Sequence, residues 1–101
     1  MKNILLICGS GASSGFMAAA IRKAAKKQGE QVTVKAASEA QIDERINEID
    51  YLLIGPHLSY MLEDLKEKAK DKDVLVTVIP QSTYGSLNGE KALELILNME
   101  G

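Results

Sequence analysis

Cysteine, aromatic residues and long apolar runs are scarce in this chain, and each scarcity excludes a class of protein. One cysteine cannot close an internal disulfide, which excludes a disulfide-stabilised scaffold and favours a reducing compartment. Three tyrosines, one phenylalanine and no tryptophan leave little for stacking on nucleic-acid bases. No apolar run approaches the roughly 20 residues of a membrane-spanning helix. We therefore expect no span and, without a signal peptide, a cytoplasmic location.

Charge of neither sign dominates the chain. Twelve basic and 14 acidic residues give a net charge of −2, which gives no reason to expect nucleic acid or an anionic membrane as a partner. The 101 residues, 46% of them hydrophobic and 26% charged, suit one packed core. We expect a single domain over residues 1–101.

Short apolar runs alternate with amphipathic segments along the whole chain. The apolar runs predict buried strands, and the segments between them have the spacing of helices. The expected strands cover residues 2–7, 31–36, 51–54 and 74–79, the expected helices cover 16–28, 38–49, 58–69 and 92–99, and a polar loop covers 81–88. Tyr60, in the third of these helices, is expected in the core.

This alternation predicts an α/β fold, an open three-layer sheet of four parallel strands in the order 2-1-3-4 with helices on both faces. In such sheets the ligand site lies beyond the carboxyl ends of the strands, near the switch point between the first and third strands. Cys8 follows the first strand at that point. The loops after the third and fourth strands reach the same edge and carry His57 and Tyr84.

A loop of small residues follows Cys8 and connects the first strand to the first helix. Its glycines leave backbone amides uncovered, and Ser13 or Ser14 can cap the helix. Such a loop can wrap an oxyanion, while the helix N-terminus favours a phosphate dianion and should lower the pKa of the Cys8 thiol. The predicted site is therefore a nucleophilic Cys8 with a phosphate-binding loop of Gly9, Ser10, Gly11, Ala12, Ser13, Ser14 and Gly15.

Other interpretations of Cys8 and its loop compete with this one. A lone cysteine at a strand end is often a small buried hydrophobe. The glycines at 9, 11 and 15 are spaced one residue too widely for a dinucleotide-binding turn, and no Gly-Lys-Ser/Thr follows for a nucleotide P-loop. A small cysteine phosphatase of similar fold would need an arginine where Ser14 stands. A redox-sensing thiol would lack a resolving cysteine.

Three further features each allow more than one interpretation. His57, the one histidine, can act as an acid or base, or as a structural or partner-contact residue. Tyr84 can hydrogen-bond a bound phosphate, pack against a partner, or pack within its loop. The second half of the first helix carries a basic cluster. Its side chains can form a solvated face that interacts favourably with the negative C-terminal end of the helix dipole, and they can also attract an acidic partner. The cluster comprises Arg22, Lys23, Lys26 and Lys27.

Three stretches resemble one known family over nearly the whole chain. They are the strand ending in Cys8 with its small-residue loop, the run Leu52-Leu53-Ile54-Gly55-Pro56-His57-Leu58-Ser59-Tyr60-Met61, and the loop Ile79-Pro80-Gln81-Ser82-Thr83-Tyr84-Gly85 with Asn88-Gly89. The chain resembles the IIB component of the bacterial sugar phosphotransferase system, lactose/cellobiose type. It departs from the family in the loop, where many members read Cys-Ser-Ala-Gly-Met-Ser-Thr-Ser.

The resemblance implies a chemistry and a set of partners. Cys8 would accept a phosphoryl group from a phosphohistidine of the IIA component and pass it to a sugar held by the membrane-embedded IIC component. The implied activity is that of a phosphocysteine–sugar phosphotransferase without metal or cofactor. The sugar would be a β-glucoside such as cellobiose, or a lactose-type disaccharide. We expect a monomer that docks transiently and meets IIC at the inner face of the membrane.

Overall fold

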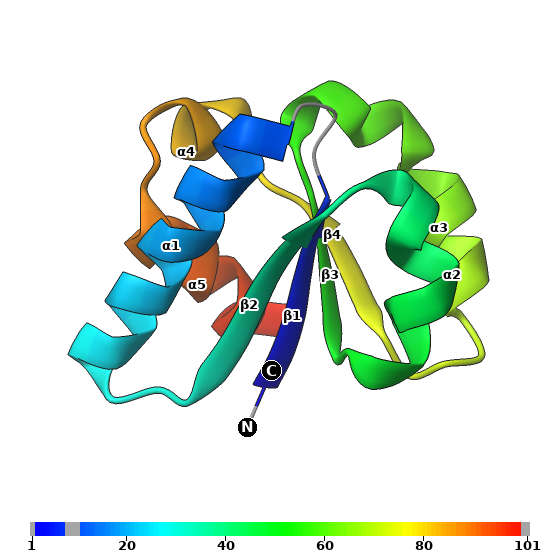
Figure 1. Ribbon diagram of the computed structural model, residues 1–101, viewed down its shortest axis with the longest axis horizontal. Coiled ribbons are helices and arrows are strands. Elements are labelled where there is room, and N and C mark those ends of the chain that lie inside the picture. Colours follow the sequence, from blue (N-terminus) through cyan, green and yellow to red (C-terminus); the bar gives the residue numbers. More distant parts are fainter. Residues whose placement is uncertain (1, 8–10, 100–101) are drawn as a thin grey trace.

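A parallel sheet of four strands forms the middle layer of the molecule (Figure 1). The structure, a computed structural model, describes residues 2–7 and 11–99. The strands are β1 (Lys2–Ile7), β2 (Val32–Ala37), β3 (Tyr51–Ile54) and β4 (Leu75–Val78). Their spatial order is β2-β1-β3-β4, so the predicted α/β fold and strand order are confirmed.

The two central strands are the most apolar. All of β3 and the part of β1 from Ile4 to Ile7 are buried, as befits strands covered on both faces. In the register Ile4 lies beside Tyr51, and Ile7 lies beside Ile54. The edge strands β2 and β4 keep exposed residues, and the prediction that β2 is an edge strand is confirmed.

One face of the sheet is covered by α1 (Gly11–Gln28), α4 (Gln81–Gly85) and α5 (Gly89–Met99), on the left in Figure 1. The β1 side chains Ile4 and Leu6 point to this face because alternate residues of a strand share a face. They pack with a buried cluster that comprises Met17, Ala18, Ile21, Val34, Tyr51, Leu53, Ile79, Tyr84, Ala92 and Ile96. Burial of each large aliphatic side chain contributes roughly 1.5–3 kcal/mol, which holds α1 and α5 on the sheet.

The opposite face receives the remaining helices. They are α2 (Ile42–Arg45) between the 3-10 turns η1 (Glu39–Gln41) and η2 (Ile46–Glu48), and η3 (Pro56–Met61) leading into α3 (Leu62–Ala69). Leu5 and Ile7 point to this face and pack with Ile42, Ile46, Leu52, Ile54, Leu58, Leu65, Ala69 and Val74. None of the helices among the described residues is long and apolar enough to cross a membrane.

The first helix begins earlier than its sequence predicts. The sequence predicts a helix from Phe16, after the last glycine of the loop, but α1 begins at Gly11. Gly15 does not interrupt it, because an added Cβ there would meet no atom within 4 Å and its φ is not positive. The predicted loop residues Gly11, Ala12, Ser13, Ser14 and Gly15 therefore belong to the helix, and the connection after β1 is shorter than predicted.

Gly15→Ala is expected to raise the free energy of unfolding by about 0.5–1 kcal/mol, because alanine loses less backbone entropy than glycine inside a helix. Urea denaturation would measure it. The matched control is Gly29→Ala at the end of α1, where φ is +76° and alanine is strained. We expect that variant to be less stable than the unchanged protein. Equal effects at the two positions would contradict a helix that runs through residue 15.

Two other expectations are wrong. The segment after Pro80, expected as a polar loop, starts with the short helix α4, in which Thr83 and Tyr84 are buried. Tertiary packing of these two side chains, which no local pattern reveals, favours the helix there. Tyr60, expected in the core, is 76% exposed. It lies off the face that buries Leu58 and Leu65, so helical spacing excludes it from the core.

Candidate functional site

The carboxyl ends of β1, β3 and β4 lie side by side at the upper edge of the sheet in Figure 1. The Gly55 N–H donates to the Ile7 carbonyl at 2.8 Å, and the Ile79 N–H donates to the Ile54 carbonyl at 2.8 Å. These bonds align the ends of three neighbouring strands. The segments that follow them therefore start at one edge, where ligands bind in open parallel sheets.

The connection from β1 to α1 contains the predicted nucleophile. Cys8, Gly9 and Ser10 lie outside the described residues, and their roles stay predictions. Helix α1 starts at Gly11, and its first turn carries no acidic side chain. Because the first four N–H groups of an α-helix have no partner within it, the start of α1 offers backbone donors and a positive dipole end beside this connection.

The structure brings together the two predicted rim residues, His57 and Tyr84. Their ring centroids lie 5.7 Å apart with an interplanar angle of 77°, an edge-to-face contact. His57 lies in η3, after β3, and is exposed. Tyr84 lies in α4, after β4, and is only 9% exposed. The two segments thus form one continuous rim beside the end of β1.

Tyr84 is fixed in place by its surroundings. Its ring belongs to the buried cluster that contains Met17 and Ile79. Its backbone N–H donates to the Pro80 carbonyl at 2.9 Å, and its carbonyl accepts the Leu87 N–H at 3.1 Å. The buried Tyr84 ring therefore provides a rigid support for the exposed His57 ring.

Two exposed aromatic side chains belong to segments that reach the same edge. Phe16 in α1 is 66% exposed, and Tyr60 in η3 is 76% exposed. Both elements adjoin the ends of β1 and β3 in Figure 1. Sequence reasoning missed this pair. The helical spacing contained a signal for Phe16. Met17 and Ala18 lie on the buried face of α1, and Phe16, which precedes them, lies outside that face.

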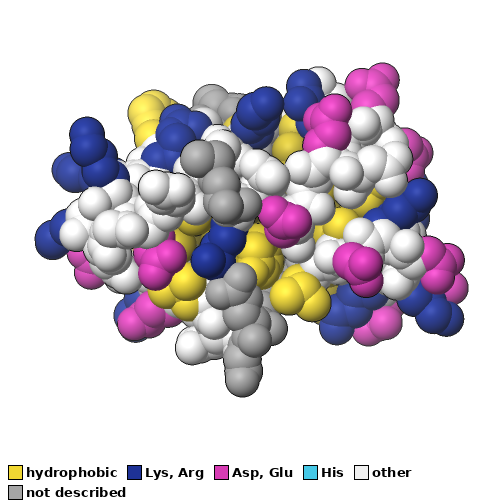
Figure 2. Space-filling model, turned by 90° about the horizontal axis from the view of Figure 1, so that it is seen from below, with side chains coloured by type: hydrophobic (Ala, Val, Ile, Leu, Met, Phe, Trp, Pro, Cys, Tyr) yellow, Lys and Arg dark blue, Asp and Glu magenta, His cyan; other side chains and the backbone are white. Residues whose placement is uncertain are grey.

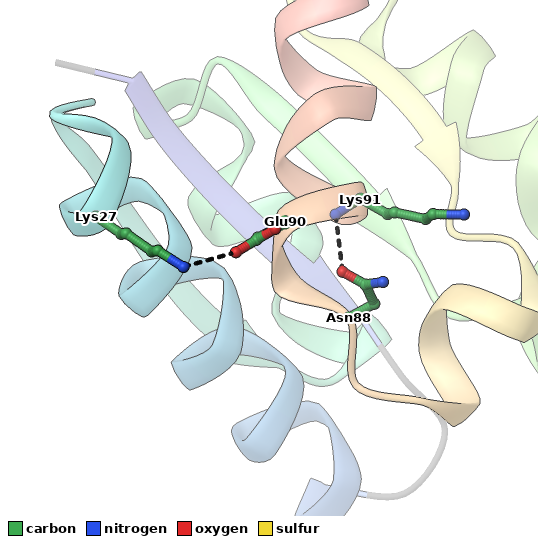
Figure 3. Close-up of polar contacts among 4 residues, drawn as sticks. All are labelled: Lys27, Asn88, Glu90 and Lys91. Carbon is green, nitrogen blue, oxygen red and sulfur yellow. Dashed lines mark hydrogen bonds and ion pairs between the residues drawn. The ribbon is translucent and has the colours of Figure 1, made fainter.

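A hollow away from this edge lies between α1 and α5. Figure 3 shows two polar contacts of residues that line it or lie next to it. It holds about 410 Å³ and is lined by Ala20, Lys23, Ala24, Lys27, Leu87, Asn88, Gly89 and Glu90. Lys27 Nζ lies 3.4 Å from Glu90 Oε1, and Asn88 Oδ1 accepts the Lys91 N–H at 3.1 Å, which caps α5. The predicted basic cluster is solvent-exposed on α1. Its Lys27 uses the ion pair to link the two helices, an exposed contact that contributes at most about 1 kcal/mol.

The opposite end of the molecule, where the strands begin, differs from the candidate site. Figure 2 shows this end, on which basic and acidic side chains are interspersed. Lys2 Nζ lies 3.9 Å from Glu30 Oε2 there. A smaller hollow of about 50 Å³ between β2 and η2 is lined by side chains that include Asn3, Thr33 and Arg45. Neither hollow is lined by His57 or Tyr84, so the rim at the carboxyl edge stands apart from both.

An open parallel α/β sheet, with a candidate nucleophile after its first strand and a rim from the two neighbouring strands, defines the class of this protein. Within that class its family is known from sequence. The chain belongs to the family of lactose/cellobiose-specific IIB subunits of the phosphotransferase system (PTS), whose model matches residues 3–95. The resemblance stated from the sequence is thereby confirmed. Members of this family are phosphotransferases that relay a phosphoryl group on a cysteine and serve sugar transport.

Individual relatives agree with this assignment. The oligo-β-mannoside-specific EIIB component of Bacillus subtilis is 32% identical over 99 residues, which are 98% of this chain and 96% of that protein. The cellobiose-specific EIIB component of Lactococcus lactis is 31% identical over 103 residues, covering 97% and 95%. The lactose-specific EIICB component of Streptococcus mutans is 26% identical over 96 residues, and there the match is 93% of this chain but only 17% of the longer protein.

Two solved structures share the fold. The cellobiose-specific IIB component of Borrelia burgdorferi has a TM-score of 0.77 and 34% identity, with 96% of this chain and 89% of that chain covered. The lactose-specific IIB domain of Streptococcus pneumoniae has a TM-score of 0.86, with 96% and 95% covered. Its 18% identity shows the fold alone.

Proposed function

We propose that this chain is the phosphoryl carrier of a lactose/cellobiose-type phosphotransferase system and that Cys8 is the residue phosphorylated. The observation that carries the proposal is the position of the β1–α1 connection. It starts at the sheet edge where Gly55 is bonded to Ile7, beside the His57–Tyr84 rim. Family membership supplies the reaction class, and the family's relay residue is a cysteine. Cys8 is the one cysteine in the chain.

The first proposed step moves the phosphoryl group from IIA to this chain. The Cys8 thiolate attacks phosphorus in line, the bond from phosphorus to the IIA histidine nitrogen breaks, and a sulfur–phosphorus bond forms. The electron pair of the broken bond returns to the imidazole, which takes up a proton. Spread negative charge on the transferring oxygens is stabilised by the backbone amides of Gly9, Ser10 and the first turn of α1, together with the hydroxyl of Ser10, Ser13 or Ser14.

The second proposed step delivers the group to a sugar held by IIC. A sugar hydroxyl oxygen attacks phosphorus, the sulfur–phosphorus bond breaks, and Cys8 leaves as the thiolate. The hydroxyl proton passes to a base supplied by the membrane component. We infer that the carrier acts in the cytoplasm and reaches IIC at the inner face of the membrane. The EIICB relatives support this partner, since their name places a IIC part and a IIB part in one component.

The rim residues are proposed as contacts for these partners. His57 is exposed and supported by the buried Tyr84, so an incoming protein meets a side chain of fixed orientation. Phe16 and Tyr60 add exposed apolar surface on the flanking elements. Exposed aromatic groups around a polar site are typical of a transient protein interface.

The sugar is proposed to be a β-linked disaccharide of the cellobiose or lactose type. Relatives of 31–32% identity carry the names of different sugars, oligo-β-mannoside, galactose and cellobiose. Similar carriers thus serve different sugars, which supports the view that IIC selects the substrate. Transport assays that pair this chain with several IIC proteins would identify the sugar.

The test of Cys8 is transfer from a phosphorylated IIA component, followed by mass spectrometry. We expect the intact chain to gain about 80 Da, on a peptide that contains Cys8. Cys8→Ser should gain nothing under the same conditions, whereas His57→Gln, which removes the other candidate acceptor at the rim, should still be labelled. Labelling of His57, or undiminished labelling of Cys8→Ser, would contradict the proposal.

A further inference from the structure

Among the described residues, strand β2 has a neighbouring strand on one side only. Its backbone groups point alternately toward that neighbour and toward the free edge. The Lys2 N–H donates to the Gln31 carbonyl at 3.1 Å, so the odd-numbered residues of this segment turn their backbone groups toward β1. In a parallel ladder every second residue bonds to the neighbouring strand. The even-numbered residues of β2 therefore direct N–H and C=O groups outward, and these are Val32, Val34 and Ala36.

One of these outward carbonyls is occupied by a side chain from α1. Arg22 Nη1 donates to the Val34 carbonyl oxygen at 2.7 Å. A charged donor at this distance makes a strong hydrogen bond. Arg22 is exposed, and the bond reaches the edge rather than the core. The sheet's own ladder does not need it.

Val34 is the middle one of the three residues of β2 whose backbone groups point outward. A symmetric pairing of two β2 strands that uses all three residues is therefore centred on Val34. If β2 of a second copy added antiparallel about a two-fold axis at Val34, Val34 would face its symmetry mate and Val32 would face Ala36. All the outward residues would then form hydrogen-bonded pairs, each exchanging two N–H···O bonds. Lys35 would face Thr33, so no like charges would oppose each other across the pair. The sequence Val-Thr-Val is also rich in β-branched residues, which favour strands.

We propose that the free edge of β2 is a self-pairing surface and that Arg22 keeps it closed. The guanidinium occupies the carbonyl through which the two copies would make their central pair, so pairing requires Arg22 to leave. Exposed strand edges pair with other strands unless a charge or a covering group prevents it. This inference is independent of the phosphoryl chemistry, because Arg22 and Val34 lie on the far side of β1 from the rim.

The test compares variants that change charge equally. Arg22→Met keeps the apolar stem but loses the donor, and Lys23→Met removes the same charge from the adjacent exposed residue. Light scattering after size exclusion, over a range of protein concentrations, should show twice the monomer mass for Arg22→Met. The unchanged protein and Lys23→Met should stay monomeric. Circular dichroism checks that each variant is folded, and Arg22→Gln replaces Arg22→Met if the latter is not.

A second substitution locates the surface of the dimer. In the Arg22→Met background, Ala36→Pro removes an outward N–H that β1 does not use, and edge positions of this kind tolerate proline. We expect the double variant to return to the monomer mass. Three results would overturn the proposal: a folded Arg22→Met that stays monomeric, a Lys23→Met that dimerises equally, or a dimer that Ala36→Pro leaves unchanged. A dimeric unchanged protein would overturn it as well.

Discussion

Gly89→Ala is expected to lower the free energy of unfolding by about 3 kcal/mol, at the upper end of what overpacking costs. A Cβ at this position would lie 2.1 Å from the Ala20 carbonyl oxygen and 2.9 Å from the Ile21 nitrogen. Both are backbone atoms of α1, so the clash is relieved only if α5 moves away from α1. Such a movement would also loosen Ala92 and Ile96, which are fully buried against the sheet.

Thermal denaturation would measure this loss as a fall in Tm of roughly 12–24 °C for a domain of this size. Gly85→Ala is the matched control, because a Cβ at Gly85 would meet no atom within 4 Å. We expect that variant to melt close to the unchanged protein. A Gly89→Ala protein as stable as Gly85→Ala would contradict the close approach of α1 and α5.

Strand positions and strand order were predictable because the signals are strong and local. Tyr51–Ile54 is wholly apolar and is followed by Gly55-Pro56, and it forms β3 with the predicted bounds. The order followed from the handedness of parallel connections, which leaves few alternatives. The same rule placed the segments of His57 and Tyr84 at one edge, and the structure brings their rings to 5.7 Å.

The errors fall where long-range packing decides the outcome. Helix α1 starts before the predicted residue because Gly15 is tolerated inside it. Helix α4 forms because Thr83 and Tyr84 are buried. The requirement for Gly89 arises from contact with Ala20, 69 positions earlier in the chain, which no local pattern contains. The Arg22 bond to Val34 likewise joins the first helix to an edge strand. Cys8 lies outside the described residues, and its role stays a prediction.

The segment after β1 and the two rim segments lack, in sequence, the groups that a cysteine phosphatase would use. Such an enzyme clamps phosphate with an arginine and protonates the leaving group with a carboxylic acid. Ser14 stands at the arginine position, and the first arginine in the chain, Arg22, donates to Val34 at the β2 edge. No aspartate or glutamate occurs before Glu30, nor in the rim segments 55–61 and 80–88. These segments therefore supply neither the arginine clamp nor the carboxylic acid that such a phosphatase uses to hydrolyse its phosphocysteine.

The phosphorylated protein is expected to lose its phosphoryl group in buffer at least about 100-fold more slowly than with IIC and sugar present, because a missing acid–base group alone costs that much in rate. Intact-mass measurement over time, with and without IIC-containing membranes and sugar, would give both rates. Membranes with IIC but no sugar are the control, and they should leave the phosphoprotein intact because no acceptor hydroxyl is bound. The unphosphorylated protein should turn over aryl phosphates no faster than Cys8→Ser does. Rapid aryl phosphate turnover that Cys8→Ser abolishes would overturn the carrier in favour of a phosphatase, since only a protein that activates water against the thiophosphate can complete that cycle.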